Sequence, residues 1–374
     1  SKSITKIEWD NEAAKKGGYP HYMLKEIYEQ PQTITTALEL DSASLDELVE
    51  MIQKSENVYL VGVGTTFYVS KFSKYLFSSL ADQFIPAISS DEFTSLATVD
   101  KKTLVLTTSQ SGETFDTISA LKYAKSKGAK TAAIVNVMGS SISRLVDKVI
   151  LQGSGPEICV ISTKAAFTQM VIMMLLALRL GLKRKVLARK EFDESLAALR
   201  ELPGIIQGIL NERSGFIHRV AHNYAKIKNW LYLGRGIYYP VALESALKMK
   251  EVAYVHAEGM SGGFLKHGTL AMIDNEVNSI VFVPPCEDKE LYEATLRSVE
   301  EIRARSGFVF GIHFDEKGRN KGLFNEELIL PNVSPLVAPL IQLVIGQLFA
   351  YFTAISLKCN IDKPRSLAKS VTVG

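Results

Sequence analysis

Short apolar runs rich in β-branched residues alternate along the chain with longer stretches of helical period. This pattern predicts parallel βα units. The runs are almost continuously apolar rather than alternating, as expected for strands that are covered on both faces of a parallel sheet. We expect strands at residues 57–64, 103–109, 131–136 and 147–151 in the first half, and at 229–236, 279–284, 307–314 and 326–331 in the second half.

The two sets of strands match in order and in spacing. The first strand of each set runs into a glycine turn, at Gly64 and at Gly236, and the fourth strands follow at nearly the same distance along the chain in both halves. Self-similarity at a nearly fixed period indicates a repeat. The sequence therefore predicts an α/β fold of two tandem lobes, each a parallel sheet flanked by helices, related by internal duplication.

Three further segments have helical patterns. Residues 21–31 have apolar positions at helical spacing, and we expect this helix to end at Pro31. Residues 181–204 are charged and helical, and we expect Pro203-Gly204 to interrupt them. The apolar residues at 336–357 predict a long buried helix. The predicted organisation is a linker and N-terminal helix at 1–44, a first lobe at 45–180, a connecting helical segment at 181–214, a second lobe at 215–358, and a C-terminal tail at 359–374 that closes the active site.

Composition and charge exclude several classes of protein. The 374 residues are 47% hydrophobic, enough for two ordinary cores, and 43 basic residues nearly balance 40 acidic ones, which argues against a nucleic acid partner. The three cysteines are far apart and form no CxxC or zinc-ligand spacing, which favours a reducing compartment and no metal. The most apolar stretch, residues 167–182, is shorter than a membrane span, and the first residues contain no signal core. We expect a soluble, cytoplasmic protein without a membrane partner.

The motif SQSGET, residues 109–114, lies where the second strand of the first lobe ends and a helix begins. Ligands bind at this edge of a parallel sheet, and the start of a helix offers unpaired N–H groups to an anion. Ser109, Ser111 and Thr114 add hydroxyl groups, Gln110 adds an amide, and Gly112 allows the backbone to approach closely. A phosphate site and an ordinary N-terminal cap of the helix both remain open from these residues alone.

The turn GVGTT, residues 62–66, places Thr65 and Thr66 at the same edge of the sheet. It is not a GxGxxG motif, and no acidic residue follows where a ribose would need one. A dinucleotide site is therefore not expected, and the sequence predicts no cofactor.

The segment at residues 242–258 begins as a helix in the second lobe, directly after a strand. Glu244, Lys248 and Glu251 follow one another at i, i+4 and i+7, so they form one stripe. A solvated salt-bridge face would have the same spacing. The position at the ligand-binding edge of a sheet weakens that interpretation, and a salt-bridge face and a site both remain open from these residues alone.

Four motifs together resemble a known family. SQSGET, LESALKMKE, LKHG in residues 265–268 and the ending PRSLAKSVTVG are similar, in order and spacing, to the isomerase domain of the glutamine:fructose-6-phosphate amidotransferase (glucosamine-6-phosphate synthase) family, which is built from two sugar isomerase (SIS) folds. The opening residues 8–31 look like the linker that precedes this domain. The likeness covers essentially the whole chain.

The resemblance implies roles for particular residues. Glu251 would move a proton between C1 and C2 of the sugar, His267 from a neighbouring subunit would open the sugar ring, Lys369 would form a Schiff base with the C2 ketone, and Lys248 would stabilise charge on the enolamine oxygen. The residues implied to hold the sugar phosphate are Ser109, Gln110, Ser111 and Thr114, and those implied to line the rest of the sugar are Thr65, Thr66, Val160, Ser162 and Ala368.

The sequence departs from the family pattern at a few positions. Phe264 replaces a usual Glu and Thr269 a usual Pro on either side of His267, Cys159 and Ile161 replace smaller residues, and the final residue is Gly374 rather than Glu. These changes bear on substrate preference and on the loop that carries His267. Residue 1 is Ser, and no glutaminase with its N-terminal catalytic Cys precedes it in the chain, so we expect no use of glutamine by this chain alone.

The implied reaction converts fructose 6-phosphate and ammonia to glucosamine 6-phosphate, with isomerisation to glucose 6-phosphate when ammonia is absent. The implied partners are a second copy of the chain and a covalently linked N-terminal glutaminase domain. A free-standing glucosamine-6-phosphate deaminase and a non-catalytic sugar-phosphate sensor remain as alternatives. Glu251, Lys248 and Lys369 argue against the sensor, because binding alone needs neither a base nor an imine-forming lysine.

Overall fold

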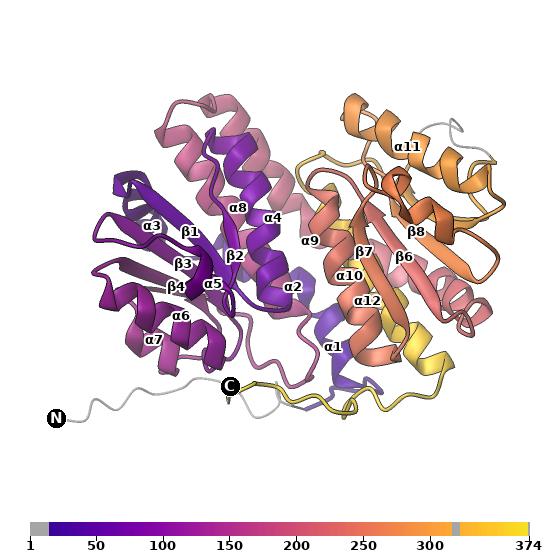
Figure 1. Ribbon diagram of the computed structural model, residues 1–374, viewed down its shortest axis with the longest axis horizontal. Helices are drawn as coiled ribbons and strands as arrows, with labels where there is room; N and C mark the ends of the chain where they lie inside the picture. The colour runs from indigo at the N-terminus through magenta and orange to yellow at the C-terminus, as the bar shows by residue number, and fades with distance from the viewer. Residues whose placement is uncertain (1–14, 316–321, 373–374) are drawn as a thin grey trace. The chain divides into compact units, whose positions relative to one another are not determined.

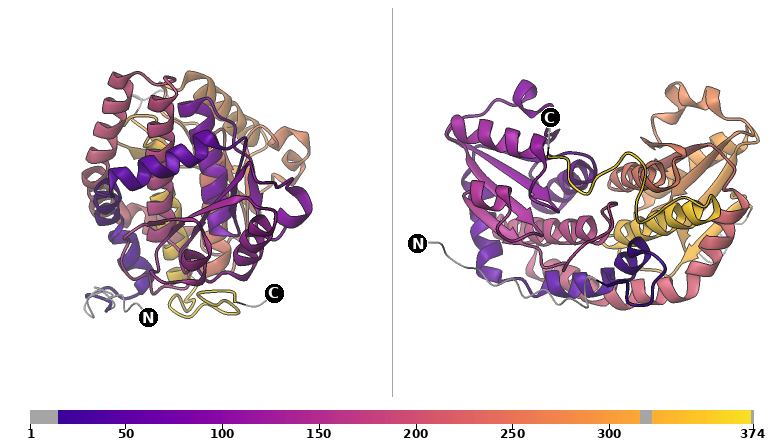
Figure 2. Two further views of the ribbon diagram at one scale, coloured as in Figure 1. Left: turned by 90° about the vertical axis from the view of Figure 1, so that its left-hand side faces the viewer. Right: turned by 90° about the horizontal axis from the view of Figure 1, so that it is seen from below.

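The computed structural model describes residues 15–315 and 322–372, so the first residues of the predicted linker and Gly374 lie outside the described part. The chain forms two compact units. The described part of the first unit comprises residues 15–74, 83–180 and 368–372, and that of the second comprises residues 75–82, 181–315 and 322–367. Figures 1 and 2 colour the chain from indigo at its N-terminus to yellow at its C-terminus. The C-terminal tail is thus divided, since its last residues belong to the first unit.

The first unit contains a five-stranded sheet in the order β2-β1-β3-β4-β5, with every pair parallel. Its strands are β1 (Asn57–Gly62), β2 (Ala87–Ser89), β3 (Thr103–Ser109), β4 (Lys130–Val135) and β5 (Lys148–Leu151). The four strands predicted for the first half are confirmed to within two residues at each end. The sequence did not indicate β2, which has only three residues, all half-buried, and carries no pattern of its own.

The second unit repeats this arrangement in the order β10-β9-β8-β6-β7, again with every pair parallel. Its strands are β6 (Asn229–Gly234), β7 (His256–Ser261), β8 (Val277–Phe282), β9 (Phe308–Phe314) and β10 (Glu326–Leu330). Read in the reverse direction, the order is β7-β6-β8-β9-β10, in which each strand corresponds in turn to β2, β1, β3, β4 and β5 of the first unit. The predicted two-lobed parallel α/β fold is confirmed, and the matching order is consistent with tandem duplication.

Two pairs of glycines show the same repeat in atomic detail. A Cβ on Gly62 would lie 2.6 Å from the backbone of Thr66, and a Cβ on Gly234 would lie 2.1 Å from the backbone of Tyr238. In both halves, the helix that follows the first strand therefore packs directly on the end of that strand. Gly64 and Gly236 follow with φ of +58° and +54°, the left-handed region that favours glycine. The two turns therefore occupy equivalent places in the repeat.

Helices cover both faces of each sheet. In the first unit, α6 and α7 lie on one side of the sheet and α4 and α8 on the other (Figure 1). The helices up to residue 183 are α1 (Tyr22–Tyr28), α2 (Gln30–Leu38), α3 (Ser42–Lys54), α4 (Thr65–Ala81), α5 (Phe93–Leu96), α6 (Phe115–Ser126), α7 (Ser141–Leu145) and α8 (Lys164–Lys183). The later ones are α9 (Arg189–Asn223), α10 (Tyr238–Ala253), the 3₁₀ turns η1 (Leu265–His267) and η2 (Thr269–Met272), α11 (Lys289–Arg303) and α12 (Ala338–Ser356).

In the second unit, alternate residues of β6 pack against different helices. Leu231 and Leu233 belong to a core cluster with Val299 and Ile302 of α11. Trp230 turns to the opposite face, where its ring packs edge-on against Phe349 of α12 at a centroid distance of 5.3 Å. Successive strand side chains point to opposite faces, so a nearly continuous apolar strand is needed to bury both.

Two helices, α8 and α12, are long and apolar enough to cross a membrane by length and composition. In each, 89% of the most apolar window is buried inside the structure, as in core helices of a soluble protein. The long buried helix predicted at 336–357 is confirmed as α12.

Two prolines do not act as the sequence suggested. The first predicted helix ends at Tyr28, and Pro31 lies in the first turn of α2, where its missing N–H would have no helical partner anyway. Pro203 and Gly204 lie inside the 35-residue helix α9 instead of ending a helix. The apolar side chains that α9 buries on both sides of Pro203, including Leu199, Leu202 and Ile206, explain why the helix continues despite one lost hydrogen bond.

Candidate functional site

The loop that follows β3 is ordered by its own hydroxyl groups. The Gly112 N–H donates to Ser109 Oγ at 2.9 Å, and the Glu113 N–H donates to Ser111 Oγ at 3.2 Å. Gly112 has a φ of +68°, and a Cβ there would lie 2.1 Å from Ser140 Oγ, so only glycine fits. The Glu113 carboxylate accepts the Ser141 N–H at 2.7 Å, which fastens the loop to the neighbouring β4–α7 turn.

The hydroxyl groups do not cap α6. Thr114 occupies the N-cap position, but its side chain makes no capping hydrogen bond, and those of Ser109 and Ser111 bond within the loop. The capping interpretation is therefore wrong for these side chains. The Phe115 N–H donates to the Val371 carbonyl at 3.0 Å, so the C-terminal tail lies against the start of α6. This combination of buried and half-buried hydroxyl groups with a helix start has the donors that bind a phosphate.

The other predicted sugar-contacting residues of the first unit lie on two further segments. Thr65 and Thr66 open α4, and Thr66 Oγ1 bonds to both the N–H and the carbonyl of Val63 at 3.0 Å. Gln110 is half-buried in the loop after β3. Thr65, Thr66 and Gln110 thus follow the carboxyl ends of the adjacent, hydrogen-bonded strands β1 and β3.

Val160 and Ser162 lie in the segment between β5 and α8, and both are half-buried. One side chain organises this segment. Glu157 accepts the backbone N–H groups of Thr163 at 2.9 Å and Ala165 at 3.1 Å, and Ser162 Oγ donates to it at 3.1 Å. Because Thr163 and Ala165 flank the first residue of α8, Glu157 also faces the positive end of that helix.

Lys369 of the tail lies on this segment rather than in solvent. Its Nζ donates to Glu157 Oε2 at 2.9 Å and to the Cys159 carbonyl at 2.6 Å, and its side chain is 27% exposed. Although burial disfavours the carboxylate, the Lys369 ammonium and the backbone donors hold the pKa of Glu157 below its usual range. Ala368, the preceding residue, is exposed.

A second buried carboxyl, that of Glu26, bonds to the same segment as Glu157 does. Glu26 of α1 accepts the N–H groups of Ile158 at 2.5 Å and Cys159 at 3.0 Å through Oε1. Burial and the nearby Glu157 charge raise the pKa of Glu26 to about 8. Two acidic side chains therefore hold one short segment, and Glu157 is the charged one at neutral pH.

In the second unit, the stripe on α10 is buried rather than solvated. Lys248 Nζ lies 3.2 Å from Glu244 Oε1 and 2.6 Å from Glu251 Oε2, and the side chains of Lys248 and Glu244 are fully buried. Burial disfavours the Lys248 ammonium, but the two carboxylates raise its pKa above the usual value. Glu251, at the end of the stripe, is 23% exposed and is the member that can reach a ligand.

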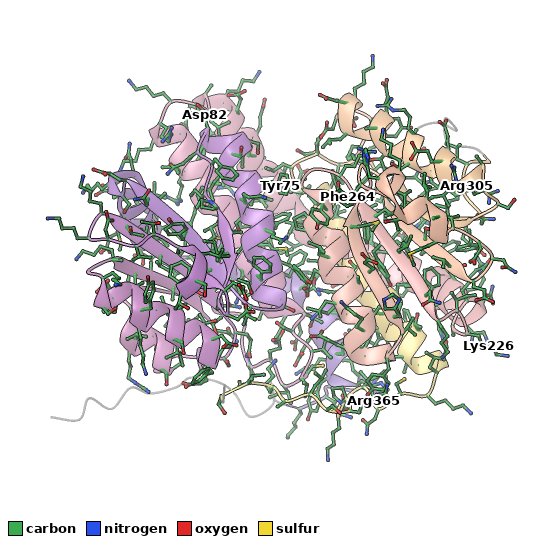
Figure 3. The ribbon with its side chains drawn as sticks, viewed as in Figure 1. Tyr75, Asp82, Lys226, Phe264, Arg305 and Arg365 are labelled. Carbon is green, nitrogen blue, oxygen red and sulfur yellow. The ribbon has the colours of Figure 1, made fainter. Side chains whose placement is uncertain are left out.

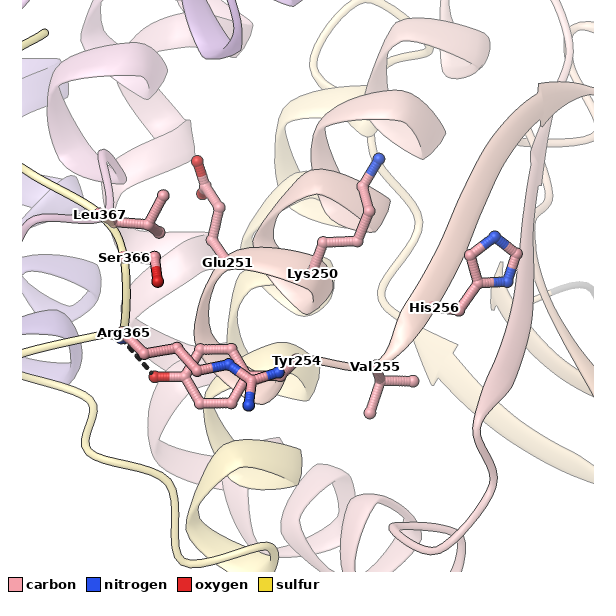
Figure 4. Close-up of a pocket in the computed structure, with 8 residues that line it drawn as sticks. All are labelled: Lys250, Glu251, Tyr254, Val255, His256, Arg365, Ser366 and Leu367. Atoms are coloured by element: carbon pink, nitrogen blue, oxygen red, sulfur yellow. Dashed lines mark hydrogen bonds between the residues drawn. The ribbon is translucent and has the colours of Figure 1, made fainter.

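Glu251 opens into a pocket of about 480 Å³ whose other wall is the C-terminal tail, at Arg365, Ser366 and Leu367 (Figure 4). Tyr254, the residue after α10, has a left-handed φ of 58° and holds this tail. Its hydroxyl accepts the Arg365 N–H at 2.9 Å, and the Arg365 guanidinium lies 4.2 Å from the centre of its ring. A left-handed residue commonly ends a helix, and Tyr254 ends α10 three residues after Glu251.

His267 is exposed at the end of η1. The ring of Phe264, itself 66% exposed and labelled in Figure 3, lies 6.3 Å from the imidazole, centre to centre. Leu265 between them is fully buried and anchors the loop. Thr269 begins η2 directly after Gly268. His267 does not line the pocket into which Glu251 opens, whereas His256, at the start of β7, does.

The predicted residues are divided between the two units. Ser109, Ser111, Ser162 and Lys369 belong to segments of the first unit, whereas Lys248 and Glu251 share a helix of the second. Sequence reasoning missed Glu157, Glu26, Tyr254 and Arg365. One feature of the sequence could have identified Glu157: it is a carboxylate in an otherwise apolar, Gly-rich segment, and such a group needs a buried partner. Among residues 15–315 and 322–372, no group of three or more metal-binding side chains occurs.

Comparisons with known proteins agree with this geometry. The model of the SIS domain family matches residues 51–179 and 223–309, one match in each half of the chain. The chain is 42% identical over 367 residues to a glutamine–fructose-6-phosphate aminotransferase (isomerizing) of Methanococcus maripaludis, covering 98% of this chain and 59% of that protein. It is 39% identical over 380 residues to the protein of the same name from Thermus thermophilus, covering all of this chain and 62% of that protein. The chain therefore spans about three fifths of the length of these curated relatives.

Among solved structures, the C-terminal domain of glucosamine-fructose-6-phosphate aminotransferase from Francisella tularensis matches with a TM-score of 0.86 and 31% identity, covering 94% of this chain and 100% of that one. A glucosamine-6-phosphate deaminase from Thermotoga maritima shares the fold, with a TM-score of 0.69 and 20% identity over 94% of this chain and 99% of that one. The chain belongs to the SIS domain family and, within it, to the C-terminal domains of glucosamine-fructose-6-phosphate aminotransferases.

Proposed function

We propose that the chain converts fructose 6-phosphate and ammonia to glucosamine 6-phosphate. The observation that carries the proposal is the fully buried Lys248 between two carboxylates, one of which, Glu251, reaches a pocket walled by the C-terminal tail. A buried charge needs compensation, and a binding module would gain nothing from this triad. The names of the relatives, all glutamine–fructose-6-phosphate aminotransferases, agree with it.

The proposed reaction begins with the phosphate. The loop after β3 and the start of α6 supply hydroxyl and N–H donors, so the phosphate fixes the sugar without taking part in the chemistry. Thr65, Thr66, Val160, Ser162 and Ala368 are proposed to line the remainder of the sugar.

Covalent catalysis follows. His267 of a second copy opens the sugar ring, and the Lys369 amine forms an imine with the C2 ketone. Ammonia then replaces the lysine at C2. Glu251 transfers a proton between C1 and C2, while the Lys248 ammonium stabilises the negative charge that develops on the enolamine oxygen.

Two partners complete the proposal. The exposed position of His267 suits a residue that acts in a neighbouring subunit, so we propose a homodimer with shared sites. The relatives are longer and are named for glutamine, which supports an additional glutaminase domain as the source of ammonia. Three free cysteines in the described part fit a reducing, cytoplasmic environment.

The test supplies ammonia directly. Fructose 6-phosphate and an ammonium salt should give glucosamine 6-phosphate, followed by ¹H NMR, and fructose 6-phosphate alone should give glucose 6-phosphate slowly. Net conversion of glucosamine 6-phosphate under all ammonia concentrations would instead favour a deaminase. Tight binding of fructose 6-phosphate with no turnover in either direction would favour a sensor.

The shared site is tested by mixing two inactive variants, Glu251→Gln and His267→Ala. If each site uses His267 from the other subunit, hybrid dimers contain one intact site and recover part of the activity. Confirmed exchange of subunits without any recovery would contradict the homodimer proposal.

A further inference from the structure

Lys369, the proposed imine-forming residue, is paired with the fully buried carboxylate of Glu157. Lys369 Nζ donates to Glu157 Oε2 at 2.9 Å, and the Glu157 side chain has no exposed surface. When an ammonium ion and a ketone condense, the C2–O bond breaks, the Nζ–C2 bond forms, and water leaves. The lysine attacks as the neutral amine, and the proton that it gives up leaves in the water. The net products are one protonated imine and one water, so Nζ carries a positive charge before and after the reaction.

We infer that Glu157 is the counter-ion of the protonated imine formed on Lys369. This inference rests on the imine role of Lys369 in the proposed function. A protonated imine makes C2 more electrophilic than a neutral imine does, so a group that keeps the imine charged accelerates the attack of ammonia that replaces the lysine at C2. Glu157 touches the reacting nitrogen and is therefore a catalytic residue in this account.

The carboxylate is held in place before substrate arrives. Its Oε1 accepts two backbone N–H groups at the start of α8, from Thr163 and Ala165, and these bonds leave Oε2 facing Lys369 Nζ. Such fixed groups act on a developing or retained charge without reorganising, and they act strongly where water is excluded.

The same Oε2 also accepts the Ser162 hydroxyl at 3.1 Å. Ser162 belongs to the segment proposed to line the sugar, so one carboxylate connects the substrate-binding segment to the nucleophile. Movement of this segment on binding would move the counter-ion and the lysine together.

Few other charges face this nitrogen within the first unit. Glu26 on α1 lies behind the segment, and its pKa of about 8 leaves it neutral at neutral pH. The Cys159 thiol is buried, and burial raises its pKa, so it stays neutral too. The Lys164 ammonium on α8 is paired with Glu29 at 2.6 Å. Glu157 thus provides the negative charge nearest to Lys369 among the described residues.

The test measures the pH at which the imine loses its proton. Cyanoborohydride reduces protonated imines and leaves neutral imines almost untouched, so its rate of trapping fructose 6-phosphate on Lys369 reports the protonated fraction. An opposite charge at this distance raises the pKa of a cation, so Glu157→Gln should lower the alkaline midpoint of trapping by roughly one to three pH units. At a pH between the two midpoints, trapping falls at least tenfold.

Two variants separate charge from structure. Glu26→Gln replaces a neighbouring carboxyl that does not touch Nζ and should leave the midpoint close to that of the unchanged protein below about pH 8. Glu157→Asp keeps the negative charge on a shorter side chain, so its trapping midpoint should lie close to that of the unchanged protein. If Glu157→Gln does not fold, the midpoint of Glu157→Asp still tests the role of the charge. Circular dichroism and binding of inorganic phosphate report folding for each variant.

The outcomes distinguish this inference from the proposed function. Borohydride, which reduces imines in either protonation state, should label Lys369 in the unchanged protein and in Glu157→Gln. Labelling of both with the same cyanoborohydride midpoint would overturn the counter-ion role and leave the function intact. Absence of any label in the unchanged protein would overturn the imine and the counter-ion together.

Discussion

The helices α4 and α10 each follow the first strand of their half of the chain, and they differ sharply at three positions. When the two halves are aligned so that Gly62 matches Gly234, the positions of Glu244, Lys248 and Glu251 on α10 correspond to those of Phe72, Leu76 and Ser79 on α4. Phe72 and Leu76 are buried apolar residues, at 0% and 1% exposure. The same fold therefore tolerates an ordinary apolar core at this place, and one copy has replaced it with a buried ion pair.

Stability alone does not explain that replacement. Burying an ion pair costs desolvation energy, and well-packed apolar residues at such a place are often as good or better. The first unit instead has its polar groups in loops, at Ser109, Ser111 and Glu157. In the proposed function, substrate binding and the covalent lysine belong to one unit and proton transfer belongs to the other.

The largest effect should come from breaking the ion pair. Lys248→Met leaves the fully buried Glu244 carboxylate without its cation and should lower the free energy of unfolding by about 3–5 kcal/mol. The double variant Glu244→Gln, Lys248→Met removes both charges and should regain most of this stability without regaining activity. Urea unfolding and the NMR assay measure both quantities. Recovery of activity in the double variant would mean that the pair is structural.

The next effect tests the binding unit. A dianion held by several charge-assisted hydrogen bonds, each worth roughly 1.5–3 kcal/mol, should bind far better than the neutral sugar. Calorimetry should therefore give a Kd for fructose at least a hundredfold above that for fructose 6-phosphate. Ser111→Ala should remove part of this difference, whereas Ser79→Ala on α4 should not. Similar affinities for the two sugars would remove the phosphate site.

The smallest effect concerns the tail. Tyr254→Phe deletes the acceptor of the Arg365 N–H and keeps the aromatic ring beneath the guanidinium, so it removes one hydrogen bond worth roughly 0.5–1.5 kcal/mol. We expect a rise in KM of a few fold, with little change in the unfolding midpoint. A fall in stability as large as that of Lys248→Met would show that Tyr254 supports the core of the unit instead of the tail.

Much of the fold could be predicted because a strand that is buried on both faces of a parallel sheet is recognisable in the sequence as a nearly continuous apolar run. Six strands, β1, β3, β4, β6, β8 and β9, are buried at nearly every position and are largely apolar. The edge strand β7, with the sequence HAEGMS, mixes exposed and buried positions and contains no apolar run. The continuation of α9 through Pro203 depends on tertiary burial, which local propensity does not contain.

The candidate site divides in the same way. The i, i+4, i+7 spacing predicted that Glu244, Lys248 and Glu251 share a stripe, but whether that stripe is solvated or buried depends on what packs against it. The contact between Glu157 and Lys369 joins residues 212 positions apart, and only the folded tail brings them together. Tyr254 and Arg365 were missed for the same reason, since their contact spans 111 positions.

Proton transfer by Glu251 on α10 is the central claim. It is tested by following fructose 6-phosphate in D₂O by NMR with the unchanged protein and with Glu251→Gln, each at saturating substrate. The account predicts exchange or transfer of the C1 proton with the unchanged protein, and a rate roughly 10²- to 10⁴-fold lower with Glu251→Gln at unaltered substrate affinity. Undiminished exchange in Glu251→Gln, with binding intact, would contradict it.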